Sequence, residues 1–400
     1  MLDFDEAQRR LAAAGRHPET TESCTLSQAD GRVLAESAAA TVDLPSADNS
    51  AMDGYAIRHA DYQPGLRFPI QQRCFAGQMP QALRPGNAIR LFTGSLMPEG
   101  ADTVVMQEDC HEADDRVEVR QAPRYADHVR KQGEDMRKGD VACAAGTLIR
   151  AAETAVLASQ GYARVKVYPR LKIGILTTGD ELIEPGQVRR AEQIYNSNGP
   201  MLSALVRGLG GGIAHVLHAG DTQASLHEAF SPLLEDCDLI LTVGGVSVGE
   251  KDLVKPAIES LGGTMDLWRV RMKPGKPVAL AHARGKPIIC LPGNPVSAFV
   301  VFTLLVSPLI RAMQGRAAIF PPVRRGTLAT EKQYKETREE FLRVRVEFAA
   351  GLDQLVPYSH QGSGVISSLP WADGLARVPP NTVAGQGDVV AYYDLRHWLS

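Results

Sequence analysis

Residues 171–179 read LKIGILTTG, an apolar run that ends in two threonines and a glycine. Such a run is typical of a strand that is buried on both faces of a parallel sheet. Similar runs follow, and helix-like segments separate most of them. The strands are expected at 213–220, 239–245, 277–281 and 287–293, and the helices at 199–209, 222–234, 253–261 and 296–313. This alternation predicts a doubly wound, mostly parallel α/β sheet.

The segments on either side have a different pattern of residues. Residues 3–14 have helical spacing, and short strand candidates separated by turn pairs then follow to about residue 150. A short helix is expected at 151–159, and short strands return after Pro321-Pro322. The sequence therefore predicts a multidomain α/β plus β fold, with a β-rich N-terminal half and a small C-terminal β-domain.

The composition excludes several classes of protein. The chain has 400 residues, of which 44% are hydrophobic and 22% charged, and its net charge is −3. That charge argues against a general nucleic-acid binder. The six cysteines form no C-x-x-C pair, the N-terminus lacks an apolar signal region, and the apolar run 296–310 is short for a membrane span. We expect a soluble cytoplasmic protein that binds neither nucleic acid nor membrane.

The loops after the predicted strands carry most of the polar side chains. Open parallel sheets bind ligands at the carboxyl ends of their strands, so the loops TTGDEL (177–182), HAGD (218–221), TVGGVSVGEKD (242–252) and LPGNP (291–295) should share one edge. Glu181, Asp221 and Asp252 place carboxylates there. Each of them has an alternative role as a helix cap or a favourable charge at a helix N-terminus.

The loop 242–252 predicts an anion site, because its glycines let backbone N–H groups approach a ligand and a helix begins just after it. It also contains Gly245-Val246-Ser247-Val248-Gly249, which matches the G-x-S-x-G nucleophile elbow of hydrolases. The helix is expected to start several residues after Ser247, and no HGGG-like loop is present; both features argue against the elbow. A serine hydrolase is kept as the rival interpretation, and its catalytic histidine would be His282, His360 or His397.

Three further segments suggest anion binding. In KPGKP (273–277), Pro then Gly predicts a type II turn that brings Lys273 and Lys276 together, although a solvated hairpin turn is the alternative. In FLRVRVEF (341–348), strand alternation predicts that Arg343 and Arg345 point outward. There they either bind an oxyanion through their guanidinium groups or simply form an ordinary charged strand face. Ser363 lies in the loop QGSG (361–364).

The whole chain resembles the bacterial molybdopterin molybdotransferases, which are similar to the E-domain of gephyrin. The resemblance rests on segments that occur in order: DNSAMDGYA (48–56), LFTGSLMPEGADTVVMQE (91–108), GEDMRKGD (133–140), TTGDEL, YNSNG (195–199), TVGGVSVGEKD, MKPGKP (272–277), LPGNPVS (291–297) and QGSG. Pro45-Ser46-Ala47 departs from the usual Pro-Pro-Phe before DNS.

The resemblance implies four domains: a linker domain (1–45 and 141–170), an inserted β-rich domain (46–140), the doubly wound domain (171–320) and a C-terminal β-domain (321–400). It implies a homodimer with active sites between subunits, in which adenylyl-molybdopterin and molybdate yield AMP and the molybdenum cofactor with Mg²⁺. A molybdopterin adenylyltransferase and molybdoenzyme apo-proteins are implied partners.

Site residues follow from the same resemblance. The molybdate pocket would comprise Lys273, Lys276, Arg343 and Ser363. The nucleotide and Mg²⁺ site would comprise Gly244, Gly245, Ser247, Gly249 and Asp252, with Glu181 and Asp221 as further metal ligands. The other positions expected to support catalysis are Asp53, Thr93, Asp135, Pro292 and Pro295. A non-catalytic scaffold is the alternative, since gephyrin-like E-domains also bind partner proteins.

Overall fold

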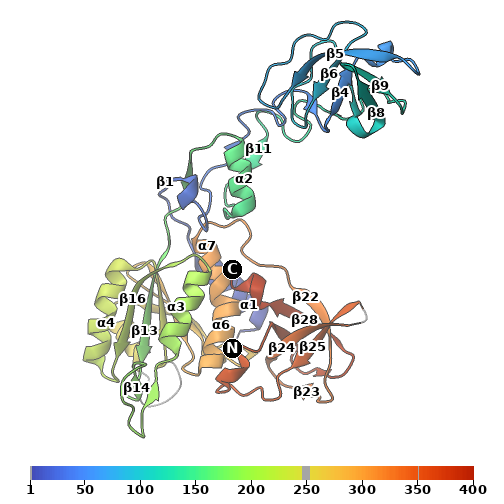
Figure 1. Cartoon of the computed structure of the whole chain (residues 1–400). Helices are drawn as coiled ribbons and strands as arrows, with labels where there is room; N and C mark the ends of the chain where they lie inside the picture. The colour runs from blue at the N-terminus through green and yellow to red at the C-terminus, as the bar shows by residue number, and fades with distance from the viewer. Residues whose placement is uncertain (1, 246–252, 350) are drawn as a thin grey trace. The chain divides into compact units, whose positions relative to one another are not determined.

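The chain forms two compact units. The computed structural model describes residues 2–245, 253–349 and 351–400. The first unit comprises Met1–Glu36, Ala145–Arg150 and Arg164–Ser400, and the second comprises Ser37–Ala144 and Ala151–Ala163. Figure 1 colours the chain along its sequence. The division into four domains stays a prediction.

A six-stranded sheet forms the centre of the first unit, in the order β16-β13-β17-β21-β20-β18. The first four of these strands are parallel, and β20 and β18 are antiparallel to their neighbours. The strands are β13 (Lys172–Thr178), β16 (Gly212–Ala219), β17 (Leu239–Val243), β18 (Thr264–Trp268), β20 (Ala279–Ala283) and β21 (Lys286–Leu291). The connecting helices are α3 (Asn198–Gly208), α4 (Gln223–Asp236) and α5 (Val254–Ser260). The predicted doubly wound, mostly parallel sheet is thereby confirmed.

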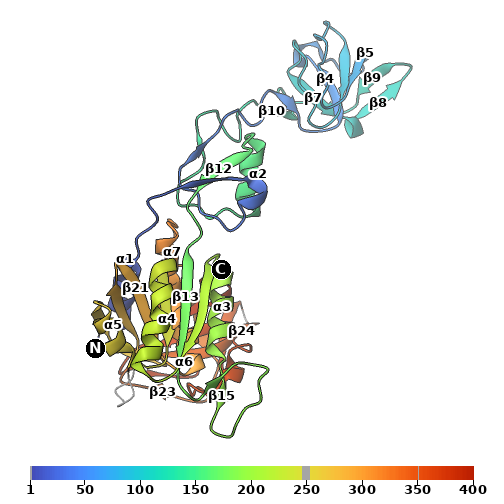
Figure 2. The same cartoon turned by 90° about the vertical axis from the view of Figure 1, so that its left-hand side faces the viewer.

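Alternate residues of the central strands face two separate cores. Ile173 and Ile175 of β13 pack in the core on the α3 side, whereas Leu176 of the same strand and Ile240 of β17 pack in the core on the α4 side. Figure 2 shows α3 and α4 on either side of β13. Each of these four side chains is fully buried, and each such burial contributes about 1.5–3 kcal/mol.

One long apolar helix fills the first core. It consists of α6 (Pro295–Val301), the π-helical segment η4 (Phe302–Val306) and α7 (Ser307–Met313). Residues 295–313 are long and apolar enough to cross a membrane, but 94% of their most apolar window is buried inside the protein. Helix α1 (Phe4–Ala14) packs against it, and Gln8 Nε2 donates to the Leu304 carbonyl over 2.7 Å. This segment is the core helix that the sequence predicted.

The C-terminal part of the first unit is a small barrel. Strands β22 (Arg324–Leu328), β24 (Glu339–Ala349), β25 (Leu352–Pro357), β26 (Gly374–Val378) and β28 (Val389–Asp394) pair in a closed ring, because β24 pairs with both β25 and β26. The predicted C-terminal β-domain is confirmed. The short strand β19 (Met272–Lys273) joins this sheet beside β24, so the lysine-containing segment extends from the central sheet to the barrel.

Shorter elements complete the first unit. They are η1 (Leu26–Gln28), the pair β1 (Glu22–Thr25) and β12 (Arg164–Val167), the pair β14 (Leu182–Ile183) and β15 (Ile194–Tyr195), the pair β23 (Tyr334–Lys335) and β27 (Val383–Ala384), η5 (Ile366–Ser368) and α8 (Leu395–Trp398).

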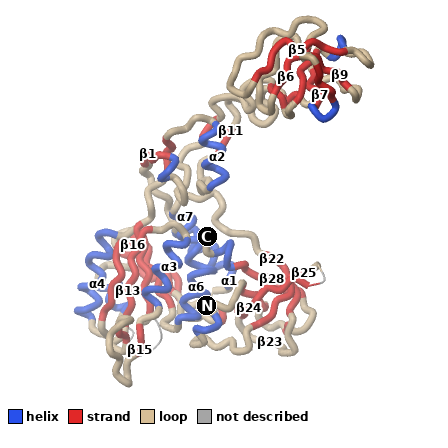
Figure 3. The backbone as a smooth tube through the Cα atoms, in the orientation of Figure 1, coloured by secondary structure: helices blue, strands red, loops and turns tan. Residues whose placement is uncertain are grey.

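The second unit is built mainly from strands and loops, as Figure 3 shows. Its largest sheet has the order β7-β4-β6-β5-β9-β8, with β4 (Gly54–Ile57), β5 (Arg67–Cys74), β6 (Ala88–Leu91), β7 (Thr103–Met106), β8 (Cys110–Ala113) and β9 (Arg116–Val119). Two further strand pairs join β2 (Ala38–Ala39) to β11 (Val141–Cys143) and β3 (Asn49–Ser50) to β10 (Val129–Arg130). The remaining elements are η2 (His59–Asp61), η3 (Gln107–Asp109) and α2 (Ala151–Ser159). The N-terminal half is β-rich, as the sequence predicted.

Gly174 tests the close packing of β13 against α4. A Cβ at this position would lie 2.4 Å from Leu233 Cδ2 and 2.7 Å from Cys237 Sγ. We expect Gly174→Ala to lower the free energy of unfolding by about 1–3 kcal/mol, because inserted atoms strain a well-packed core. Urea denaturation followed by circular dichroism measures the change.

Gly364→Ala is the matched control, because a Cβ at Gly364 would meet nothing within 4 Å. Its effect should stay within about 0.5 kcal/mol. Equal urea midpoints for the two variants would contradict the packing assigned to Gly174.

Candidate active site at the carboxyl edge of the central sheet

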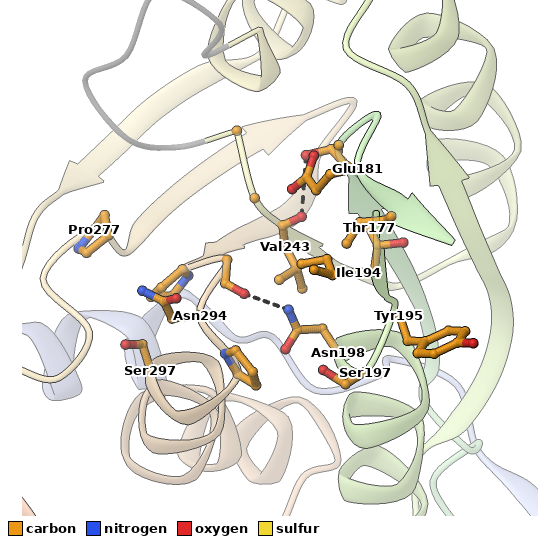
Figure 4. A pocket seen from close by; sticks show the side chains of 18 of the residues that line it. Thr177, Glu181, Ile194, Tyr195, Ser197, Asn198, Val243, Pro277, Asn294 and Ser297 are labelled. Atoms are coloured by element: carbon orange, nitrogen blue, oxygen red, sulfur yellow. Dashed lines mark hydrogen bonds between the residues drawn. The ribbon is translucent and has the colours of Figure 1, made fainter. Parts of the chain in front are cut away.

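A cavity of about 510 Å³ opens where the parallel strands of the central sheet end. Four strand-end loops line it, as predicted, and residues 194–198, which run from β15 to the start of α3, add a further wall. The lining residues are Thr177, Thr178, Gly179, Glu181, Leu182, Ile194, Tyr195, Ser197, Asn198, Asp221, Val243, Gly244, Gly245, Pro277, Pro292, Gly293, Asn294, Pro295 and Ser297. In Figure 4, Pro277, Asn294 and Ser297 lie on one side of this space, and Glu181, Thr177 and Tyr195 lie on the other.

Two glycines form part of this surface. Gly244 and Gly245 have φ angles of +92° and +64°, which L side chains rarely adopt. A Cβ at Gly244 would lie 2.8 Å from Thr178 Oγ1, and one at Gly245 would lie 2.5 Å from a methyl of Val254. Both positions therefore require glycine, as the anion-loop interpretation assumed.

The rest of that loop lies outside the described residues. This applies to Ser247, Gly249 and Asp252, so neither the nucleophile elbow nor the predicted role of Asp252 is tested by geometry. Helix α5 begins at Val254, with Leu253 as its N-cap and no side-chain hydrogen bond at that cap.

Asp221 does not cap the helix that follows it. The N-cap of α4 is Thr222, whose hydroxyl accepts from Ser225 N over 3.2 Å, so the capping alternative was wrong for Asp221. Instead, Asp221 N donates to Asp180 Oδ1 over 3.0 Å, and Asp180 N donates to Asp221 Oδ2 over 3.4 Å. This reciprocal pair joins the loops after β13 and β16 and places the Asp221 carboxylate at the cavity, where Glu181 also lies.

The opposite wall is the loop that opens the core helix. Asn294 is the N-cap of α6 and Pro295 its first residue, as predicted. Asn198 Nδ2 donates to the Gly293 carbonyl over 2.7 Å, and Asn294 Nδ2 donates to Ser363 Oγ over 3.3 Å. Pro292 and Pro295 line the cavity, and Ser363 reaches it through Asn294.

The sequence analysis quoted the motifs that contain Thr177, Ser297 and Pro277 but gave these lining side chains no role of their own. Ser297 had a detectable signal, since it lies in the first turn of a helix whose N-cap was predicted to face the ligand. Pro277 had none, because its position depends on how the segment 273–277 leaves the sheet.

The predicted pairing of Lys273 and Lys276 was wrong in its geometry. The Lys273-Pro274 peptide bond is cis, and no hydrogen-bonded type II turn forms at residues 273–276. Lys276 is exposed, whereas Lys273 Nζ pairs with Glu336 and, over 3.0 Å, with Glu340. The two lysines therefore do not face one another across a shared turn.

Lys273 lies instead in a neighbouring cavity of about 400 Å³. Burial alone lowers the pKa of its ammonium group, but hydrogen bonds and charges from Glu336 and Glu340 outweigh burial and raise the pKa overall. Lys273 in turn lowers the pKa of Glu336. Glu340 is only 4% exposed, so its carboxylate needs a positively charged partner, and Lys273 is one such partner.

The outward orientation predicted for Arg343 was also wrong. Its side chain is fully buried, and burial lowers its pKa to about 10. The guanidinium donates to Ser368 Oγ over 3.0 Å and to three consecutive carbonyls, those of His360, Gln361 and Gly362, over 3.0–3.1 Å. The strand alternation failed because the loop 358–368 folds over the outer face of β24. Arg345 on the same strand is exposed, as predicted.

The second unit brings Asp53 and Thr93 together. Asp53 Oδ1 accepts from the backbone N and the hydroxyl of Thr93, both over 2.8 Å, and these two hydrogen bonds lower its pKa. β3, within DNSAMDGYA, pairs with β10, and Lys131, which follows β10 and precedes GEDMRKGD, forms an ion pair of 2.8 Å with Asp48. Asp135, in GEDMRKGD, is exposed.

The histidines of the hydrolase interpretation and possible metal-binding groups can be located only among the described residues. Among them, no group of three or more His, Cys, Asp and Glu side chains is arranged to hold a metal ion. No histidine is among the described residues that line the candidate cavity. His282 pairs with Asp266, and His397 lies 3.2 Å from Asp394.

Three family descriptions match successive parts of the chain. Residues 2–161 match the MoeA N-terminal region (domain I and II), residues 174–312 match a probable molybdopterin binding domain, and residues 325–395 match the MoeA C-terminal region (domain IV). The candidate cavity lies within the second of these.

Similar proteins extend over the whole chain. A molybdopterin molybdenumtransferase of Haemophilus influenzae is 38% identical over 82% of each chain, and molybdopterin molybdenumtransferase 2 of Mycobacterium tuberculosis is 34% identical over 100% of this chain and 99% of that protein. The solved molybdopterin biosynthesis MoeA protein of Pyrococcus horikoshii has a TM-score of 0.83 at 27% identity, covering 98% of this chain and 99% of that one. The chain therefore belongs to the molybdopterin molybdenumtransferase family.

Proposed function

We propose that the protein inserts molybdenum from molybdate into adenylyl-molybdopterin and releases AMP and the molybdenum cofactor in a Mg²⁺-dependent reaction. The observation that carries the proposal is the cavity at the carboxyl edge of the sheet. It combines a glycine surface open to a phosphate chain with the carboxylates of Glu181 and Asp221. Family membership supplies the substrate class.

The proposed reaction has two parts. Water cleaves the phosphoanhydride of adenylyl-molybdopterin, which yields AMP and the phosphate of the pterin. The two dithiolene sulfurs replace oxygen ligands of molybdate, and the displaced oxygens leave as water or hydroxide. The backbone at Gly244 and Gly245 would hold the phosphates, and the wall formed by Asn198 and Asn294 would orient the remainder of the substrate.

Glu181, Asp221 and Asp252 would hold Mg²⁺, because carboxylate oxygens are its preferred protein ligands. Glu181 and Asp221 fit this role, since both line the cavity from adjacent loops, and Asp252 lies outside the described residues. Bound Mg²⁺ would neutralise phosphate charge and polarise the phosphoryl oxygens.

The molybdate subsite would be formed by Lys273, Lys276 and Ser363, with Arg343 acting on the loop that carries Ser363. Asn294 links this subsite to the nucleotide cavity, since it lines that cavity and donates to Ser363. The buried Arg343 has donated most of its N–H groups to carbonyls of the loop 360–362, so we assign it a positioning role.

Asp53, Thr93 and Asp135 belong to the second unit, and we propose that they serve the cavity of a partner chain in a cytoplasmic homodimer. A molybdopterin adenylyltransferase would supply the substrate, and molybdoenzyme apo-proteins would receive the product.

Mixed dimers test the shared site. Asp53→Asn and Asp221→Asn should each lower AMP release by at least about 100-fold, because each removes a carboxylate from every site. After the two variants are mixed and subunits exchange, activity should return, because half of the sites in a heterodimer carry neither change. Release of AMP from adenylyl-molybdopterin with molybdate and Mg²⁺ is the measurement.

Glu192→Gln, which neutralises an exposed acid outside the cavity, should leave AMP release unchanged. Activity that stays absent in the mixture, with subunit exchange demonstrated by mass, would show that the two aspartates act within one chain. Full activity in both single variants would favour the alternative that the protein is a non-catalytic scaffold.

Molybdate binding tests the lysines. The double variant Lys273→Ala/Lys276→Ala should bind molybdate at least about tenfold more weakly, because charged hydrogen bonds contribute about 1.5–3 kcal/mol each. Glu336→Gln/Glu340→Gln should bind it more tightly, because Lys273 would lose the carboxylates that compete with the anion. Isothermal titration calorimetry measures both affinities. Undiminished binding by the lysine variant would argue against this subsite.

Arg343→Lys separates a positioning role from direct contact with the anion. Lysine keeps the charge but lacks the planar fork that spans the carbonyls of residues 360–362. Amide hydrogen exchange in residues 358–368 should become at least about tenfold faster, and molybdate affinity should fall with it. Arg345→Lys is the matched control on the same strand. If molybdate affinity falls while exchange in this loop stays unchanged, Arg343 contacts the anion itself.

A further inference from the structure

Arg90 is a buried cation in the second unit, close to the pair formed by Asp53 and Thr93. It belongs to β6, three residues before Thr93, and its cross-strand partner on β4 is Tyr55, two residues after Asp53. Strands β4, β5 and β6 lie side by side in this sheet (Figure 1). Arg90 is only 8% exposed. A charge that is buried to this extent is costly unless its surroundings compensate it, so the contacts of Arg90 need an explanation.

Aromatic rings hold the guanidinium of Arg90 in place. Its Cζ lies 4.8 Å from the centre of the Tyr55 ring and 5.0 Å from the centre of the Phe92 ring. Phe92 in turn stacks on Phe75, with ring centres 4.4 Å apart and an angle of 7° between the ring planes. Cation–π attraction therefore fixes Arg90 against Phe92, the residue that directly precedes Thr93.

The same guanidinium is also connected to the backbone at Asp53. Arg90 Nη2 donates to the side-chain oxygen of Gln107, and the backbone N–H of Gln107 donates to the Asp53 carbonyl over 3.0 Å. Arg90 is thus linked to Asp53 through Gln107. It is linked to Thr93 through Phe92. The two hydrogen bonds of 2.8 Å from Thr93 to the Asp53 carboxylate join the same two segments, so they depend on how those segments are held.

The groups bonded to Arg90 do not cancel its positive charge. Nη2 donates to a neutral amide, and Nη1 has no hydrogen-bond partner among the described residues. The charge therefore acts on groups that are further away. Hydrogen bonds from Thr93 are the main reason that the pKa of Asp53 is lowered, and the charge of Arg90 lowers it further. The other titratable side chains on which this charge acts are Tyr55, Cys110 and Glu112.

We propose that Arg90 is a positioning residue, which holds Asp53 and Thr93 in one fixed arrangement and keeps a positive charge near the Asp53 carboxylate. The proposal rests on the role in a partner chain's cavity that was proposed above for Asp53. Because its side chain is buried, Arg90 acts through these two residues and does not itself contact the substrate.

Arg90→Met and Arg90→Lys separate the charge of Arg90 from its packing. Methionine keeps a flexible apolar chain against the two rings but removes the charge, whereas lysine keeps the charge and loses the planar guanidinium. In Arg90→Met, kcat for AMP release should fall at least about tenfold, with KM changed by less than about twofold, because a misplaced group affects the rate more than binding.

The pH profile of kcat gives a readout that a purely structural role would not move. Removal of a nearby positive charge raises the pKa of Asp53, so less of its carboxylate is ionised at a given pH. The acid limb of the profile should therefore move to higher pH in Arg90→Met. Arg90→Lys should keep the wild-type acid limb and a larger part of the activity.

Amide hydrogen exchange at Thr93 tests the geometry without substrate, because this N–H donates to the Asp53 carboxylate. It should become at least about tenfold faster in Arg90→Met. Arg116→Met is the matched control, because it removes an exposed arginine from β9 of the same sheet, and it should match the wild type in every measurement. Circular dichroism checks that each variant is folded, and Arg90→Gln replaces Arg90→Met if the latter does not fold.

The proposal is overturned if the acid limb and the exchange at Thr93 both stay as in the wild type when the charge of Arg90 is removed. Faster exchange at Thr93, in a protein whose Asp53→Asn variant keeps full activity, has a different meaning. It would support the structural link from Arg90 to the pair and count against the role proposed for Asp53 in the reaction.

Discussion

The parallel register around β13 fixes where the candidate active site lies. Thr177 of β13 pairs with Val243 of β17, and Val243 pairs with Leu291 of β21, so three strands end at the same level. β16 lies on the other side of β13, which makes β13 the point where the chain changes direction across the sheet. The loops with Glu181, Asp221, Gly244 and Asn294 converge for this reason. No local feature of any one loop would bring them together.

Two close contacts between loops shape the cavity at which these loops converge. Gly244 and Gly245 let the loop after β17 lie against Thr178 and Val254 at distances that a Cβ would forbid. On the other side, the barrel is attached to the central sheet through β19 and β24, and the buried Arg343 holds the loop whose Ser363 meets Asn294. A short chain of hydrogen bonds thus connects the barrel with the candidate cavity.

How well the sequence predicted a feature depended on how far apart along the chain the interacting residues lie. Runs such as residues 171–179 predicted the central strands, because burial on both faces leaves a local apolar signature. The N-cap at Asn294 and the glycine loop were likewise local. Arg343 was misplaced because alternation along β24 cannot show that a loop from residues 358–368 covers its outer face. Lys273 was misplaced because it forms ion pairs with Glu336 and Glu340, which lie more than sixty positions away in the chain.

The charges of the candidate active site show why its carboxylates need a cation. Glu181 and Asp221 are the charged side chains among its described lining residues, and both are acidic. The proposed substrates, a pyrophosphate-linked nucleotide and molybdate, are also anions. Two unit charges 4 Å apart interact with about 4 kcal/mol at an effective dielectric constant of 20, so this cavity repels the bare substrates. A divalent cation reverses the sign of that interaction, because the carboxylates then attract the complexed phosphate. The acid-lined cavity would thus select the metal-bound nucleotide, while the lysines beside it would receive the molybdate.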